Sequence, residues 1–96
     1  MKAIKRSQKW IEKNHYVING VNWSRYAIML ATPKMGVLMG EREHNGRLQW
    51  GVWYFYVRDE YTLDYACEFI TDDRQVAYGM FDYRHDMMVS AANERY

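Results

Sequence analysis

The side chains that could carry out nucleophilic or metal chemistry are few and far apart in this sequence. Cys67 is the only cysteine, and a thiol needs a base such as histidine beside it to act as a nucleophile. His15, His44 and His85 form neither an HxH nor an HxxxH pair, the spacings that bring metal ligands together. Cys67 lies in an alternating apolar stretch, where a lone cysteine usually serves as a small buried hydrophobe. The sequence therefore predicts no catalytic residue, no metal ligand and no cofactor.

Two pairs of carboxylates have the four-residue spacing that places side chains together on a helix: Asp64 with Glu68, and Asp82 with Asp86. Paired carboxylates can act as general acid and base. At this spacing they are more often solvated surface charges, and the chain contains no GxSxG, P-loop or GxGxxG motif. We therefore expect a protein that is not an enzyme and has no small-molecule substrate.

Length and composition limit the architecture. A chain of 96 residues can build one small core, so we expect a single domain over residues 1–96. One cysteine excludes a disulfide framework within the chain, and one proline with six glycines argues against disorder. No apolar run is long enough to span a membrane, and the basic N-terminus lacks the apolar core of a signal peptide. The expected location is the cytoplasm, with no membrane partner.

Charge is divided unevenly along the chain. Residues 1–58 contain ten Lys and Arg against three Asp and Glu, a net charge of +7, whereas residues 59–96 contain three against nine, a net charge of −6. Two interpretations remain open: either the halves pack together and neutralise each other, or each half meets a partner of opposite charge.

The strand pattern centres on residues 50–57 (WGVWYFYV), where five aromatic residues and two valines predict a central strand. Asn45-Gly46 predicts a two-residue hairpin turn that joins this strand to residues 36–44. Residues 22–31 predict a third strand after the Asn19-Gly20 turn, and residues 16–18 a short fourth. The hairpin register would place Gly40 opposite Gly51, which predicts a helix approaching closely there.

Helical patterns flank this sheet. Residues 2–14 predict an amphipathic helix, and residues 72–92 a longer one that Thr71 or Asp72 caps. Gly79 inside the second helix predicts a close contact. Residues 61–70 fit both a strand and a helix, and Thr62 as an N-cap favours the helix. The predicted fold is α+β: a three- to four-stranded antiparallel meander packed with an N-terminal helix and one or two C-terminal helices.

The hairpin register also separates two faces of the central strand. We assign to the core the face that bears Leu38, Trp53, Phe55 and Val57. We expect the opposite face to be partly exposed, because it mixes tyrosine hydroxyls and charges with apolar side chains: Val37, Met39, Glu41, Glu43, Leu48, Trp50, Val52, Tyr54 and Tyr56.

This second face predicts a protein-binding surface. Trp, Tyr, Met and Arg are enriched at interfaces, and Trp, Tyr and Arg dominate their binding energy. The Met87-Met88 pair would add adaptable surface. The predicted partner-binding residues are Trp50, Tyr54, Tyr56, Arg42 and Arg47.

A nucleic-acid interface is the alternative. Over residues 22–70 the strand order, with Trp53-Tyr54-Phe55 running into residues 62–66 (TLDYA), is similar to the βββα pattern of integrase-arm and AP2-type DNA-binding domains. That resemblance implies DNA binding through the sheet, although Glu41 and Glu43 stand where those domains carry arginines and would repel phosphates. Five basic residues on one stripe of the N-terminal helix would then contact the phosphates: Lys2, Lys5, Arg6, Lys9 and Lys13.

The short, aromatic- and methionine-rich chain also resembles, in character, the small accessory proteins of tailed bacteriophages. The resemblance implies a non-enzymatic inhibitor that binds a host or defence protein complex in the host cytoplasm. The target would be a nucleic-acid enzyme such as a nuclease, a restriction or CRISPR system, or a polymerase.

Overall fold

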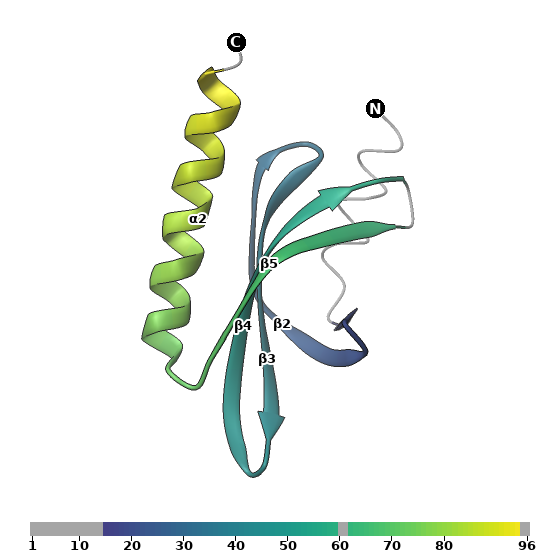
Figure 1. Ribbon diagram of the computed structural model, residues 1–96, viewed down its shortest axis with the longest axis vertical. Helices are drawn as coiled ribbons and strands as arrows, with labels where there is room; N and C mark the ends of the chain where they lie inside the picture. Colours follow the sequence, from purple (N-terminus) through teal and green to yellow (C-terminus); the bar gives the residue numbers. More distant parts are fainter. Residues whose placement is uncertain (1–14, 60–61, 95–96) are drawn as a thin grey trace.

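The computed structural model describes residues 15–59 and 62–94, which form a five-stranded antiparallel sheet and one long helix (Figure 1). The strands are β1 (His15–Ile18), β2 (Val21–Thr32), β3 (Met35–His44), β4 (Arg47–Val57) and β5 (Leu63–Thr71), and the helix is α2 (Arg74–Glu94). Each strand pairs with the next in sequence, so the sheet is a meander. The predicted α+β class is confirmed, but the sheet has five strands rather than three or four. The helix predicted for residues 2–14 lies outside the described residues.

The β3–β4 hairpin has the register that the sequence predicts. Asn45 and Gly46 take φ angles of 54° and 76°, as a two-residue turn with left-handed central residues requires. His44 pairs with Arg47, Gly40 with Gly51, and Leu38 with Trp53, so the prediction is confirmed.

Residues 61–70 were predicted to favour a helix, and that prediction is wrong. Leu63–Thr71 form β5, which pairs antiparallel with β4. The helical interpretation depended on local signals only, a cap at Thr62 and an apolar stripe. Pairing with β4 satisfies the backbone groups along the outer edge of the central strand, and this long-range contact overrides the local preference.

The sheet is curled, and its concave side holds one core cluster. Side chains from all five strands converge there without a covering helix among the described elements: Tyr16, Ile18, Trp23, Leu38, Trp53, Phe55 and Leu63. The Trp23 and Trp53 rings meet edge to face, with centroids 4.9 Å apart. The predicted core assignment of Leu38, Trp53 and Phe55 is confirmed, since all three are fully buried.

The glycine pair in the hairpin has a different cause from the one predicted. A Cβ at Gly40 would lie 3.0 Å from Trp23 Cβ, and one at Gly51 would lie 2.7 Å from Trp53 Cζ2. Indole rings of the concave cluster therefore fill the space that was expected to receive a helix. Gly79 was also expected to mark a close contact, but a Cβ there would meet no atom within 4 Å among the described parts of the chain.

Helix α2 packs on the convex side of the sheet (Figure 1). Asp73 caps it rather than Thr71 or Asp72: Asp73 Oδ1 accepts hydrogen bonds from the backbone N–H of Gln75 (2.9 Å) and of Val76 (3.3 Å). Ala77 and Phe81 pack against the sheet in a second core cluster, with Val37, Met39, Trp50 and Val52. The helix thus covers much of the face that was expected to be partly exposed.

A β-bulge interrupts the pairing of β5 with β4. Val52 pairs with Phe69 and Tyr54 with Ala66, so Cys67 and Glu68 together oppose Trp53. Cys67 takes a φ of 59°, which costs a residue with a Cβ roughly 1–2 kcal/mol. Arg84 of α2 reaches this point, where its Nη1 donates to the carbonyls of Cys67 and, over 3.2 Å, of Val52. The helix therefore holds the bulge in place.

Candidate functional site

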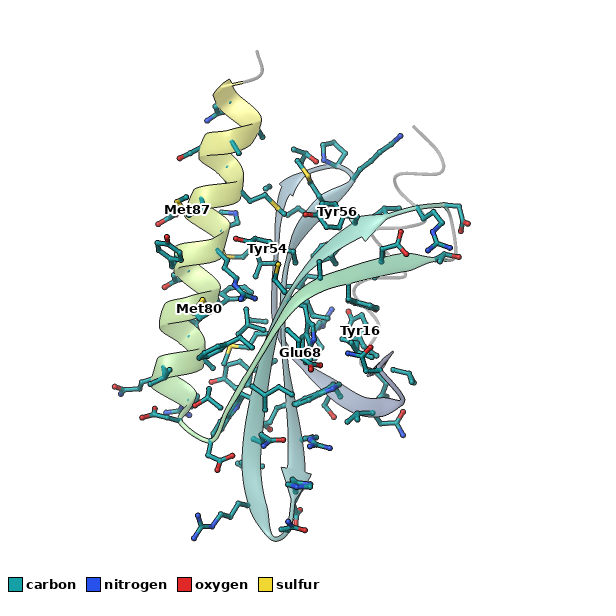
Figure 2. All side chains as sticks on the ribbon, in the orientation of Figure 1. Tyr16, Tyr54, Tyr56, Glu68, Met80 and Met87 are labelled. Carbon is teal, nitrogen blue, oxygen red and sulfur yellow. The ribbon has the colours of Figure 1, made fainter. Side chains whose placement is uncertain are left out.

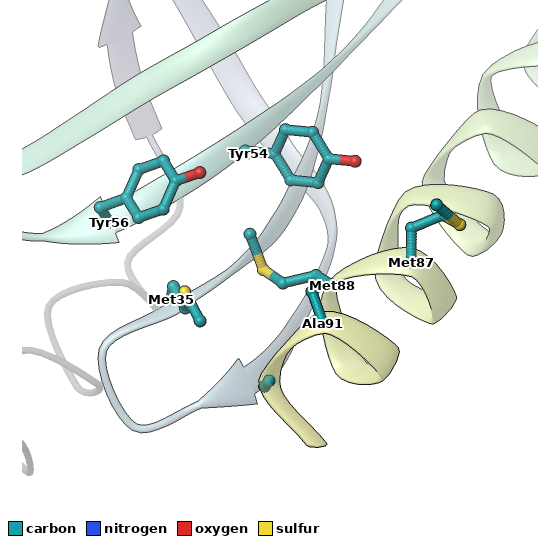
Figure 3. A pocket seen from close by; sticks show the side chains of 7 residues that line it. Met35, Tyr54, Tyr56, Met87, Met88 and Ala91 are labelled. Carbon is teal, nitrogen blue, oxygen red and sulfur yellow. The ribbon is translucent and has the colours of Figure 1, made fainter. Parts of the chain in front are cut away.

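An apolar groove lies where the C-terminal half of α2 passes the beginning of β3 and the end of β4. Figure 3 shows Tyr54, Tyr56 and Met35 from the sheet facing Met88 and Ala91 from the helix across this space. The groove has a volume of about 430 Å³. We call it the methionine groove, and its lining residues are Met35, Tyr54, Tyr56, Met87, Met88, Ala91 and Ala92.

The residues that line the groove differ in their exposure. Met88 is buried, whereas 39% of Tyr56 and 51% of Met87 are exposed. Tyr54 is half-buried, with the Arg84 guanidinium 5.2 Å from the centre of its ring. Burial raises the pKa of the Tyr54 phenol, and the nearby Arg84 charge opposes that rise. The phenol therefore stays a neutral hydrogen-bond donor at physiological pH.

An exposed apolar stripe on α2 continues from the groove. Val76, Tyr83 and Met87 follow one another at seven- and four-residue intervals, so they lie on one face of the helix. All three are exposed, Tyr83 to 60%. Figure 2 shows Met80 and Met87 on the same helix, with Tyr54 between the helix and the sheet. The groove and the stripe form one apolar surface through their shared residue Met87.

The three aromatic residues predicted to bind a partner lie on one face, but they differ in accessibility. Trp50 is buried under α2, and its Nε1 donates to Glu41 Oε2 at 2.9 Å. Tyr54 and Tyr56 line the methionine groove. The burial of Trp50 leaves the two tyrosines as the accessible part of the predicted surface.

The two predicted arginines lie elsewhere. The hairpin register places Arg42 and Arg47 on the opposite face of the sheet from Trp50. Arg42 stacks over Trp23, 5.0 Å from the ring centre, and donates to Gln49 Oε1 at 2.9 Å. Arg47 is exposed beside the hairpin turn. The structure therefore does not bring the five predicted residues into one surface.

Sequence reasoning missed Met35 and the place of the helix in the groove. Met35 follows the Thr32-Pro33-Lys34 connection, and its antiparallel pairing with Tyr56 brings it beside the aromatic strand. The hairpin register could have shown this pairing. The basic residues of the alternative, Lys2 to Lys13, lie outside the described residues.

The remaining chemical candidates are dispersed. Cys67 is exposed at the bulge, so its expected burial is wrong. Asp64 and Glu68 lie on a strand and have separate partners, Arg58 for Asp64 and Trp53 for Glu68. Within residues 15–59 and 62–94, no three His, Cys, Asp or Glu side chains gather as a metal site would require. α2 is not apolar enough over a sufficient length to cross a membrane.

Comparisons with protein-family models, with curated proteins and with solved structures find no match for this chain. The functional argument therefore depends on the surfaces described above.

Proposed function

We propose that this protein is a non-enzymatic binding protein that docks the methionine groove and the adjoining stripe of α2 onto a partner protein. The observation that carries the proposal is the open groove itself, where Tyr56 and Met87 remain exposed beside buried Met88. Methionine side chains adapt to irregular partners, and tyrosines provide large contact area with a polar end. Such a groove suits an apolar side chain or helix face from another protein.

The partner that we propose is a larger enzyme whose activity the protein modulates. In keeping with the resemblance to phage accessory proteins, the target class is a host or defence enzyme that acts on nucleic acid. A chain of this size with one apolar surface is suited to blocking a site or a conformational change in such an enzyme. Inhibition by binding requires no catalytic group from this chain.

Affinity purification with quantitative mass spectrometry tests the proposal. Tagged wild-type protein should recover a stoichiometric enzyme partner from bacterial cells, and the purified partner should lose activity when the protein is added back. The double substitution Tyr56→Ala with Met87→Lys should abolish both results. Leu48→Lys, at an equally exposed apolar position near the hairpin turn, is the matched control and should behave as wild type. Equal recovery by both variants, or no stoichiometric partner, would contradict the proposal.

Nucleic-acid binding is the second candidate, and the observation that favours it is the net charge of +7 over residues 1–58. Lys2, Lys5, Arg6, Lys9 and Lys13 would contact the phosphates. Gel shifts at increasing salt provide the test, because phosphate contacts weaken steeply as salt rises. Absence of binding at low salt would remove this candidate.

A further inference from the structure

The bulge in β5 turns one carboxylate toward the gap between the two edge strands of the described sheet. Because Cys67 and Glu68 share the place opposite Trp53, Glu68 takes a direction that regular alternation would not give it. Its Oε1 accepts hydrogen bonds from Trp53 Nε1 at 3.2 Å and from Asn19 Nδ2 at 3.3 Å. Asn19 belongs to the β1–β2 turn, so Glu68 links the two edges of the curled sheet.

This arrangement is maintained against backbone strain. Cys67 holds a positive φ, which a residue with a Cβ adopts only when its surroundings enforce it. Arg84 enforces it from α2 through hydrogen bonds to the carbonyls of Cys67 and Val52. Strain of this kind gathers at ligand sites, where it sets the direction of a side chain.

A pocket of about 390 Å³ lies beside Glu68. Trp53 and Leu63 of the concave cluster line it, together with Tyr65, Asn19 and Glu68. Burial raises the pKa of the Tyr65 phenol to about 12, so this ring remains neutral. In Figure 2, Glu68 and Tyr16 lie on the side of β5 away from α2. The pocket thus places the exposed carboxylate of Glu68, held through Oε1 by Trp53 and Asn19, beside the partly exposed ring of Tyr65. It lies on the opposite side of the sheet from the methionine groove.

The pocket carries a negative charge that the described residues do not neutralise. Asp64 also lines it, but Asp64 is bound through both oxygens by Arg58, and this hydrogen bond raises the pKa of Arg58. Glu68 contacts only the neutral donors of Trp53 and Asn19 in the described part of the chain. Both donors bind Oε1, so Oε2 remains able to accept a hydrogen bond from a ligand.

We propose that this pocket binds an organic cation, a primary ammonium or guanidinium group on a short alkyl stem. The cation would donate to Glu68 Oε2, and its stem would lie against the accessible side chains of Tyr65 and Val17. The inference does not depend on the proposed function, because none of its residues lines the methionine groove. The same chemistry is available from a free polyamine or from an arginine or lysine side chain of a protein.

The indole N–H resonance of Trp53 in a ¹⁵N–¹H NMR spectrum tests the proposal directly, because that N–H is bonded to Glu68. Titration of the full chain with agmatine, which carries both an ammonium and a guanidinium group, should shift this resonance saturably. The indole N–H of Trp50 serves as the internal reference, since Trp50 lies in the core cluster under α2 and does not line the pocket. Absence of a saturable shift at low salt would overturn the proposal.

Glu68→Gln keeps an oxygen acceptor for Trp53 and Asn19 but removes the charge. This variant should bind agmatine at least about tenfold more weakly, because charged hydrogen bonds are roughly twice as strong as neutral ones. Glu43→Gln is the matched control at an exposed position on β3 and should bind as wild type. Equal affinity of Glu68→Gln and wild type would overturn the proposal, with thermal unfolding confirming that both variants are folded.

A second titration identifies the source of the cation. The peptide Gly-Arg-Gly presents the same guanidinium from a peptide backbone. Tighter binding of the peptide than of agmatine would assign the pocket to a protein side chain, and the reverse order would assign it to a free amine. If neither agmatine nor the peptide shifts the Trp53 resonance, the proposed site is refuted.

Discussion

The two faces of the sheet reach burial by different routes. On the concave face, all five strands contribute buried side chains, and Trp53 and Phe55 are fully buried. On the convex face, buried side chains come from two strands and α2, while Tyr56 and Met87 stay exposed at the margin. Curvature brings side chains together on the inner face and spreads them apart on the outer face. One helix can cover the middle of a convex surface but not its ends, and the methionine groove lies at such an end.

The largest expected effect is on the concave face. Trp53→Ala should lower the free energy of unfolding by about 3–5 kcal/mol, because it empties the centre of the cluster and leaves a cavity. That loss is comparable with the whole stability of many domains of this size. Urea denaturation measures it, and Tyr56→Ala on the convex margin should cost under about 1 kcal/mol. Similar losses for both variants would show that the two faces do not differ as described.

The substitution Gly51→Ala should give the next largest loss of stability. The added methyl group would collide with the Trp53 ring, so the substitution should cost about 1–3 kcal/mol through overpacking. The shift of the urea midpoint measures this loss, provided that the dependence of the unfolding free energy on urea concentration is unchanged. A loss much smaller than about 1 kcal/mol would mean that the concave cluster can shift to accept extra volume.

The substitution Gly79→Ala should increase the stability rather than lower it. A Cβ there meets no described atom within 4 Å, and alanine favours a helix over glycine by about 1 kcal/mol. The variant should therefore be more stable by about that amount, and an increased melting temperature would show this. Destabilisation would reveal a contact of α2 on its outer side.

The smallest effect concerns pH. The pKa of Tyr65 is raised to about 12 by burial, whereas in the unfolded chain it is near 10. Between these values the unfolded chain loses the proton first, so stability falls as pH rises from about 10 to 12. Because Tyr65 is partly exposed, we expect a loss of roughly 1 kcal/mol or less. Tyr65→Phe should reduce the decline of the unfolding free energy over this pH range. An unchanged decline would show that the Tyr65 phenol is exposed to solvent rather than buried.

Local signals in the sequence were sufficient for the hairpin and for the long helix. Asn45-Gly46 determines register by turn geometry alone, and the register in turn identifies Trp53 and Phe55 as core. Residues 61–70 could not be assigned in this way, because alternation and helical spacing coexist there and pairing with β4 decides between them.

The face on which the helix docks was also beyond the sequence. Both faces of β4 are apolar. The direction in which the sheet curls decides which face the strands can bury without the helix. This choice buried Trp50 and left Tyr56 accessible, so the predicted aromatic surface was only partly present. The bulge at Cys67 had no sequence signal, since glycine is the usual residue at such a φ.

The meander has a consequence for how the molecule forms. Every strand pair joins neighbours in the sequence, so most of the sheet can assemble by closing short loops, at little entropic cost. Hairpins can therefore appear in order while the chain is still being synthesised. The hydrogen bond between Asn19 and Glu68, 49 positions apart, can form only once β5 exists, so the two edges of the curled sheet are joined last.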